Sequence, residues 1–435
     1  MTPRSRARKS GRDPDNLRAV SFRNALSAAA RMPMACGSLE SSYPLRYALP
    51  EIRWRSAAPD RIRRGLRHEA QFARFRAAPQ TILVCLSTDK RKPSSNPVPR
   101  SVLIVKLAAI GDVVMALPMV TALRAADPDT RITWLCGATV APLLGCVEAI
   151  DELIVVDDAA VLAGTRMRKA QVVMSTWNAL RARHFDLVIT AHSDPRYRML
   201  AARVRGAERR WLGERGGRSR LIPGRHYGDE YVRLVTGVDD HHAVRFTPPP
   251  VRAALDANVA ERIGDSTGNL VALAPGGARN PARDNPLRRW PLERYAALAE
   301  LLAAKGCTVL LTGSSDDAWV RSAFAGVPII DLVGTTTLPG LFALFAQCAA
   351  VVTHDSGPMH LARLSGAPVV GLFGPTLPAT FLRESARVIA LWPGAELPCA
   401  PCYDGIAFAE CSDNRCMQLI EPADVAARID ALLAR

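Results

Sequence analysis

Residues 101–112 read Ser101-Val102-Leu103-Ile104-Val105-Lys106-Leu107-Ala108-Ala109-Ile110-Gly111-Asp112 and form the first segment with a clear structural pattern. The apolar, partly β-branched run 102–105 is typical of a buried parallel strand, and 107–111 is the turn that follows it. From Asp112 onward the apolar side chains recur at helical intervals. Strand, turn and helix in direct succession predict the first unit of a parallel sheet.

The same alternation continues outward to the C-terminus. In the first half, further strands are expected at 131–135, 153–156 and 185–190. In the second half, strands are expected at 270–274, 308–312, 329–333, 350–353 and 368–373, and helices at 291–305, 316–324, 338–347, 358–365 and 421–434. Gly, Pro and Asp cluster between 237 and 268, which indicates a break between the halves.

These elements predict an α/β protein with two Rossmann-like, doubly wound domains that face a central cleft. We place the N-terminal domain at 101–245, a linker at 246–268 and the C-terminal domain at 269–435. Sheets of this kind bind ligands beyond the carboxyl ends of their strands, so the chemistry is expected at that edge.

The basic charge of the chain is concentrated in its first hundred residues. Residues 1–100 hold 21 Lys and Arg against 7 Asp and Glu, whereas the remaining residues hold 35 against 34. The folded body therefore gives no electrostatic sign of nucleic-acid binding. Residues 1–100 are expected to be a basic, disordered extension, because their composition cannot bury enough apolar surface. An arm that binds nucleic acid or membrane, or a true start further downstream, are the alternatives.

No segment of the sequence is long and apolar enough to be a convincing membrane span, and no secretory signal is apparent. Ten cysteines in 435 residues do not make a disulfide scaffold. We therefore expect a cytoplasmic protein, and peripheral contact with the inner face of the membrane remains open.

Asp112 is the first candidate for chemistry. An acid at a strand-to-helix junction most often caps the helix. The functional alternative is a general base at the carboxyl edge of the sheet, within reach of an attacking hydroxyl.

A second candidate segment is 353–360, Thr353-His354-Asp355-Ser356-Gly357-Pro358-Met359-His360. It follows an expected strand and opens a helix whose first amides can hold a phosphate. The carboxylate of Asp355 can accept from a sugar hydroxyl, and His360 can donate to an anion. An ordinary strand-to-helix loop is the alternative reading.

The third candidate is the pair of loops around Gly276 and the adjacent arginines Arg288 and Arg289. The glycine lets a ligand approach the backbone, and arginine offers a fixed fork for phosphate oxygens. Solvated surface arginines are the alternative. Gly313 and Asp317 follow another strand and are consistent with contact to a nucleoside. Neither a dinucleotide fingerprint nor a Walker loop occurs, so amides, arginines and carboxylates are expected to hold a nucleotide.

Several segments resemble glycosyltransferase family 9, the ADP-heptose:lipopolysaccharide heptosyltransferases. The matches run in order from about residue 101 to 430: Ile104-Val105-Lys106-Leu107-Ala108-Ala109-Ile110-Gly111-Asp112-Val113-Val114, Phe185-Asp186-Leu187-Val188-Ile189, Arg288-Arg289-Trp290-Pro291, Leu311-Thr312-Gly313-Ser314, Asp355-Ser356-Gly357-Pro358-Met359-His360-Leu361-Ala362 and Phe373-Gly374-Pro375-Thr376.

The resemblance implies a GT-B fold and an inverting transfer that needs no metal or other catalytic cofactor. It implies that the first domain binds the acceptor, an envelope glycan or glycolipid such as lipopolysaccharide core, and that the second binds ADP-heptose. By the same analogy Asp112 is the base. The implied donor-binding residues are Gly276, Arg288, Arg289, Gly313, Asp317, Asp355, Ser356, Gly357 and His360. Arg288 stands where the family has lysine.

The acceptor is the least constrained part of this resemblance. Members often carry Asp-Leu-Gln-Gly after the strand at 185–189, where this chain reads Thr190-Ala191-His192-Ser193-Asp194-Pro195. A protein O-heptosyltransferase and a sugar-nucleotide epimerase or hydrolase on the same scaffold are the alternative functions. A non-catalytic binder whose basic arm contacts nucleic acid or anionic lipid is a further one.

Four cysteines fall within 18 residues, at Cys399, Cys402, Cys411 and Cys416. Such a group can supply a tetrahedral thiolate site, so a structural zinc or iron is one expectation. Free buried thiols are the other.

Overall fold

The computed structural model describes residues 98–213, 225–237, 245–264, 266, 268–280, 283–405 and 407–434. The fold described below belongs to one compact unit within Lys90–Arg435. The predicted extension 1–100 lies outside the described residues except for 98–100.

The first half is a five-stranded sheet in which every neighbouring pair is parallel, in the order β3-β2-β1-β4-β5. The strands are β1 (Ser101–Val105), β2 (Arg131–Gly137), β3 (Glu152–Val156), β4 (His184–Thr190) and β5 (Arg205–Trp211). The helices are α1 (Ile110–Ala116), α2 (Pro118–Ala126), α3 (Ala141–Leu144), α4 (Asp158–Ala163), α5 (Arg166–Leu180), α6 (Pro195–Leu200) and α7 (Tyr227–Thr236).

The second half is a six-stranded parallel sheet in the order β10-β9-β6-β11-β12-β13. Its strands are β6 (Leu270–Ala274), β9 (Thr308–Leu311), β10 (Ile330–Asp331), β11 (Ala350–His354), β12 (Val369–Leu372) and β13 (Val388–Leu391). Its α-helices are α9 (Leu292–Ala304), α10 (Leu338–Gln347), α11 (Gly357–Ser365), α12 (Pro378–Phe381), α13 (Arg415–Gln418) and α14 (Pro422–Leu433), with α8 (Ala257–Ile263) between the halves. Short 3₁₀ helices are η1 (Pro286–Arg288), η2 (Ser315–Phe324) and η3 (Pro393–Glu396), and β7 (Arg279–Asn280) pairs with β8 (Arg283–Asp284).

The two sheets confirm the predicted α/β fold of two Rossmann-like halves. Strands β1, β6 and β11 are almost wholly buried, as expected of central parallel strands covered by helices on both faces. Two fully buried tryptophans fix the packing, because the indole of Trp134 donates to the carbonyl of Lys106 and that of Trp290 to the carbonyl of Ile420, each at 3.0 Å.

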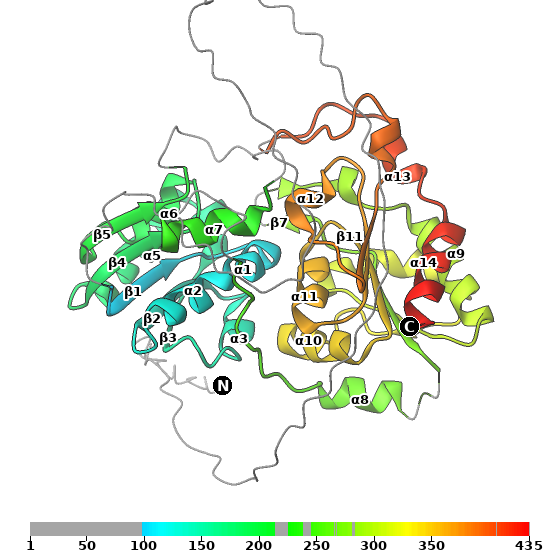
Figure 1. Ribbon diagram of the computed structural model, residues 1–435, viewed down its shortest axis with the longest axis horizontal. Helices are drawn as coiled ribbons and strands as arrows, with labels where there is room; N and C mark the ends of the chain where they lie inside the picture. The colour runs from blue at the N-terminus through cyan, green and yellow to red at the C-terminus, as the bar shows by residue number, and fades with distance from the viewer. Residues whose placement is uncertain are drawn as a thin grey trace, which may run out of the picture. The chain divides into compact units, whose positions relative to one another are not determined.

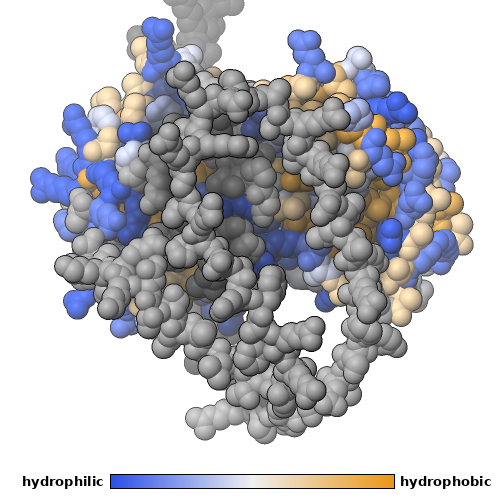
Figure 2. Space-filling model, turned by 45° about the horizontal axis from the view of Figure 1, so that its top comes forward, coloured by the Kyte–Doolittle hydropathy of each residue, from blue (hydrophilic) through white to orange (hydrophobic). Residues whose placement is uncertain are grey.

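Helices α1 and α11 meet between the two sheets (Figure 1). Hydrophilic and hydrophobic residues are interspersed over the visible part of the described surface (Figure 2). The contact between α1 and α11 therefore joins the half that holds the first sheet to the half that holds the second.

Several elements differ from the expectation. Strands β5 and β13 were not predicted, and the helix expected at 316–324 is the 3₁₀ helix η2. The strand expected at 329–333 is reduced to Ile330–Asp331. β5 reads Arg-Gly-Ala-Glu-Arg-Arg-Trp and lies at the edge of its sheet, where an apolar pattern is not required.

Candidate functional site

A cavity of about 1370 Å³ lies between the carboxyl ends of the two sheets. It is lined by residues that follow β1 and β4 in the first sheet and β6, β9 and β11 in the second. At the pairs β1–β4 and β6–β11 the order of strands reverses, which is where open α/β sheets bind ligands.

Asp112 lies on the first wall of this cavity and does not cap a helix. Helix α1 begins at Ile110 with no side-chain hydrogen bond to its first amides, and Asp112 sits within its first turn. Its carboxylate instead accepts a hydrogen bond of 3.0 Å from the ammonium of Lys106, the residue directly after β1. The side chain of Lys106 is 1% exposed, whereas that of Asp112 is 32% exposed and lines the cavity.

Burial and the lysine act on Asp112 in opposite directions. Burial favours the neutral acid, but the charge and hydrogen bond of Lys106 favour the carboxylate, and the pKa of Asp112 is lowered from its usual value. The pKa of Lys106 is itself lowered, because burial outweighs its attraction to Asp112. The ring of Tyr231 lies 5.3 Å from the ammonium and covers it. Asp112 is thus an ionised carboxylate at neutral pH.

Two glycines allow α1 and α11 to approach closely. A Cβ atom on Gly111 would lie 2.5 Å from Cδ2 of His360, and one on Gly357 would lie 3.2 Å from Cβ of Ile110. His360 therefore packs against the helix that carries Asp112, as well as lining the cavity. Burial lowers the pKa of His360 to about 4, so it faces the cavity as a neutral imidazole.

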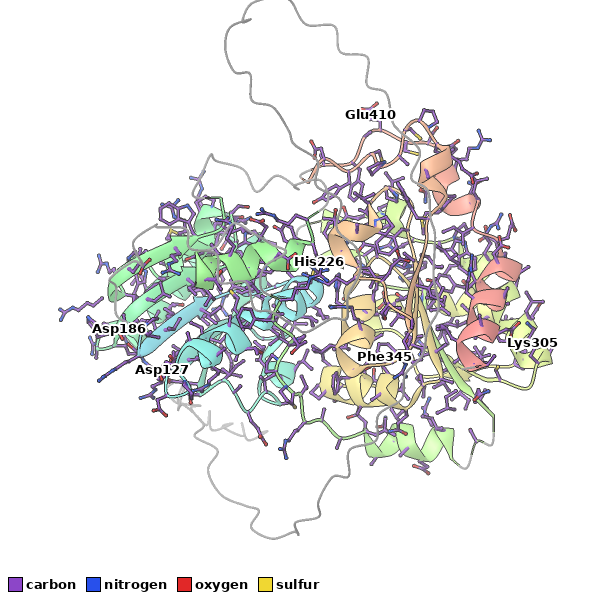
Figure 3. All side chains as sticks on the ribbon, in the orientation of Figure 1. Asp127, Asp186, His226, Lys305, Phe345 and Glu410 are labelled. Atoms are coloured by element: carbon purple, nitrogen blue, oxygen red, sulfur yellow. The ribbon has the colours of Figure 1, made fainter. Side chains whose placement is uncertain are left out.

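A second contact joins the two halves at α7. Asp229 of α7 pairs with Arg383, which lies just beyond α12. His226, directly before α7, lies at the same junction (Figure 3). The cavity is therefore bounded by contacts at α1–α11 and at α7–α12.

Arg288 lies on the opposite wall, and one of its N–H groups has no hydrogen-bond partner among the described residues. Its Nη1 donates to the carboxylate of Asp355 at 3.3 Å, and the hydroxyl of Thr376 donates to the same carboxylate at 2.9 Å. The Nε of Arg288 is buried and has no hydrogen-bond partner among the described residues. A buried donor left free on a charged group is the feature expected of a site that binds an anion.

Asp317 shapes the neighbouring loops. Its carboxylate accepts from the amide of Gly277 at 2.9 Å and from the amide and hydroxyl of Ser314 at 2.9 and 2.7 Å. A Cβ on Gly276 would lie 2.4 Å from its carboxyl carbon, and one on Gly313 would lie 3.0 Å from its Cβ. Asp317 thereby holds both glycine loops against the cavity.

The remaining predicted donor residues divide into those that line the cavity and one that does not. Ser356 and Gly357 line it at the start of α11, where the hydroxyl of Ser356 donates to the carbonyl of His354 at 3.1 Å. Arg289 does not line it. This guanidinium pairs with Asp284, donates to the carbonyl of Gly277 at 3.1 Å and lies 5.2 Å from the ring of Trp319. Arg289 therefore supports the glycine loop from behind.

The predicted metal site is not supported. In the part of the chain that the structure describes, no three His, Cys, Asp or Glu side chains are grouped so that they could hold a metal. Cys399, Cys402, Cys411 and Cys416 are free thiols, and Cys399 and Cys411 are exposed. Burial, together with the neighbouring Cys402, raises the pKa of the Cys416 thiol to about 11. None of the four lines the cavity, although Tyr403 and Phe408 of the same loop do.

Sequence reasoning assigned no role to two residues of the cavity region, Lys106 and His192. Lys106 belongs to a segment that resembles the family, but no role was expected for its side chain. A lysine directly after a buried strand is a signal in itself, since a buried ammonium needs a partner. His192 follows β4 and lines the cavity beside Asp112.

Comparisons with known proteins agree with this arrangement. Residues 254–409 match the sequence model of the family described as "Glycosyltransferase family 9 (heptosyltransferase)". A lipooligosaccharide heptosyltransferase 2 of Haemophilus influenzae is 37% identical over 29% of this chain, which spans only 37% of that relative's length. A lipopolysaccharide heptosyltransferase 1 of Pseudomonas aeruginosa is 26% identical over 76% of this chain and 98% of its own.

Among solved structures, the Escherichia coli ADP-heptose lps heptosyltransferase II is similar in fold. Its TM-score is 0.58 at 20% sequence identity, and the match covers 77% of this chain and 98% of that one. At this identity the match supports the fold alone.

Proposed function

We propose that the chain is a glycosyltransferase of family 9 and that it transfers heptose from ADP-heptose to a lipopolysaccharide core or related envelope acceptor. The names of the relatives support the sugar and the class of acceptor. The domain assignment proposed from the sequence is kept: residues 101–245 bind the acceptor, 246–268 link the halves, and 269–435 bind the nucleotide sugar. One observation carries the proposal: an ionised carboxylate lies on one wall of the cavity, and an arginine whose buried Nε has no partner among the described residues lies on the other.

The proposed reaction is a single displacement with inversion. The acceptor hydroxyl gives its proton to the carboxylate of Asp112 while its oxygen forms a bond to the anomeric carbon of heptose. The bond from that carbon to the diphosphate breaks, and its electron pair leaves with ADP. Negative charge grows on the diphosphate, where Arg288 and the amides at the start of α11 stabilise it. In this scheme the protein's own arginine and amide groups stabilise the negative charge on the diphosphate, without a metal.

Donor binding tests the second wall. Replacing Arg288 by glutamine removes the cation of this wall, and we expect the Kd for ADP, measured by calorimetry, to rise about 10- to 100-fold, the value of one or two charged hydrogen bonds. Arg288→Lys should recover part of the affinity. Arg252→Gln is the matched control, because Arg252 is 76% exposed and lies outside the cavity. Equal ADP affinity in the wild type and Arg288→Gln would contradict the assignment.

Turnover distinguishes the proposed transfer from the alternatives. The wild type is incubated with ADP-heptose alone, with de-acylated lipopolysaccharide core, and with acceptor peptides. Heptose attached to the core supports the proposal. Release of heptose without any acceptor would indicate a hydrolase, and transfer only to peptide would indicate a protein heptosyltransferase.

We also propose that the protein works in the cytoplasm against the inner face of the membrane, with α5 as the docking surface. Among the described residues no helix could span a bilayer. In α5, Met167 is 75% and Met174 64% exposed. Residues 159–185 contain five Lys and Arg and no Asp or Glu, which suits an anionic lipid surface.

Vesicle binding tests this surface. The double variant Arg166→Gln/Lys169→Gln removes two positive charges from α5. At about 1 kcal/mol per charge, the full chain should bind phosphatidylglycerol vesicles about tenfold more weakly, or weaker still. Arg252→Gln/Arg428→Gln removes the same charge elsewhere and should bind as the wild type does. Equal co-sedimentation of all three proteins would rule out α5 as the docking surface.

A further inference from the structure

The loop after β4 places a histidine on the same wall as the proposed base. β4 pairs with β1 so that Thr190 lies opposite Val105, and the amide of Ala191 donates to the carbonyl of Val105 at 3.0 Å. His192 follows at once and lines the cavity. His192 and Asp112 line the same cavity, and the charges of Asp112 and Lys106 both act on the imidazole ring.

The ring of His192 is held in one orientation. It stacks on Tyr197 with the ring centres 4.1 Å apart and the planes 7° from parallel. The amide of Asp194 donates to its Nδ1 at 2.9 Å. Tyr197 is itself buried, so the stacking partner is fixed. The free edge of the imidazole is therefore Nε2.

The proton of His192 resides on that free edge. Burial, together with the nearby ammonium of Lys106, lowers the pKa of His192 to about 4, so the ring is neutral at neutral pH. A neutral imidazole has one N–H, and Nδ1 is occupied as an acceptor. Nε2 is thus a hydrogen-bond donor, and it donates to no side chain or carbonyl among the described residues.

The surrounding charges indicate what this donor binds. Asp112, Asp158 and Asp194 line the same wall, and its two cations are already engaged, because Lys106 pairs with Asp112 and Arg196 with Asp194. The wall therefore offers no unpaired cation among its described residues to a carboxylate or phosphate. A hydroxyl suits both the carboxylates of this wall and the imidazole N–H of His192, because it can donate a hydrogen bond to a carboxylate and accept one from an N–H.

We propose that Nε2–H of His192 binds a second hydroxyl of the acceptor sugar and so orients the hydroxyl that Asp112 deprotonates. This inference rests on the proposed transferase function and adds a residue that selects and positions the acceptor. His192 moves no proton in this role. Its position in the loop 190–195 gives the chain an acceptor contact of its own.

Two variants distinguish the effect of the hydrogen-bond donor of His192 from the effect of its aromatic ring. His192→Phe keeps an aromatic ring that can stack on Tyr197 but has no N–H, whereas His192→Gln keeps an N–H donor without the ring. With ADP-heptose and de-acylated lipopolysaccharide core, His192→Phe should raise the acceptor KM and lower kcat/KM for the acceptor about tenfold, the value of one lost hydrogen bond in a closed site. His192→Gln should recover most of that loss.

Donor binding and pH dependence exclude other roles. The Kd for ADP should be the same in the wild type and both variants, and kcat/KM of the wild type should show no transition near the usual pKa of histidine. An unchanged acceptor KM in His192→Phe, or equal loss in both variants, would overturn the proposal while leaving the transferase function intact. Absence of transfer by the wild type would instead overturn the proposed function.

Discussion

Asp112→Asn is expected to lower kcat for heptose transfer by about 10²- to 10⁴-fold, the usual contribution of a general base. Asparagine keeps the size of the side chain and can still accept the hydrogen bond from Lys106, but it cannot take a proton from the acceptor. The fold and the donor wall should therefore be retained, with a modest loss of stability because the buried ammonium of Lys106 loses its counter-charge. Initial rates at saturating ADP-heptose and core acceptor measure the effect.

Asp112→Ala provides the matched control for this variant. It should be as inactive as Asp112→Asn but less stable, since it leaves the ammonium of Lys106 buried without its partner. The Kd for ADP should remain close to the wild-type value in both variants, because Asp112 and Arg288 lie on opposite walls of the cavity. Transfer by Asp112→Asn at the wild-type rate would show that another group is the base.

Lys106→Met is expected to have the largest effect on stability. It removes the partner of a carboxylate that is largely enclosed by the two halves, and breaking a buried ion pair from one side costs about 3–5 kcal/mol. Asp112 keeps one-third of its surface open to the cavity, so the lower end of this range applies here. Denaturation by urea gives the free energy of unfolding.

The double variant Lys106→Met/Asp112→Asn tests whether the pair is the cause. Because both charges are gone, no unpaired ion remains in the double variant. Its loss in free energy of unfolding should therefore be smaller than the sum of the losses in the two single variants. Strictly additive losses would mean that Lys106 acts through packing against Tyr231 rather than through Asp112.

The sequence was sufficient for the central strands because their burial requires apolar residues. β6 is a continuous apolar run and β1 and β11 are mostly apolar, and the residues after these strands were expected at one edge. The edge strand β5 carries charged residues and has no such requirement, so no apolar pattern marks it. The same reasoning placed Asp112 and Asp355 at the cleft without any knowledge of the register.

The details of the site depend on contacts that a linear sequence does not contain. Arg288 and Arg289 are adjacent, yet one lines the cavity and the other supports a loop from behind. The pairing of Lys106 with Asp112 depends on how the turn after β1 folds back, and the spacing of the cysteines does not bring them together as metal ligands.

The most direct test is the pH dependence of kcat/KM for the wild type and Lys106→Met, measured side by side. The wild type should be flat from about pH 5.5 to about pH 8, because the pKa of Asp112 lies below its usual value and the base is already ionised. In Lys106→Met the main influence that lowers the pKa of Asp112 is gone, and burial, the largest influence, raises it, so the acid limb should move to higher pH and activity should recover as pH rises. Superimposable profiles for the two proteins would contradict an Asp112 base held ionised by Lys106.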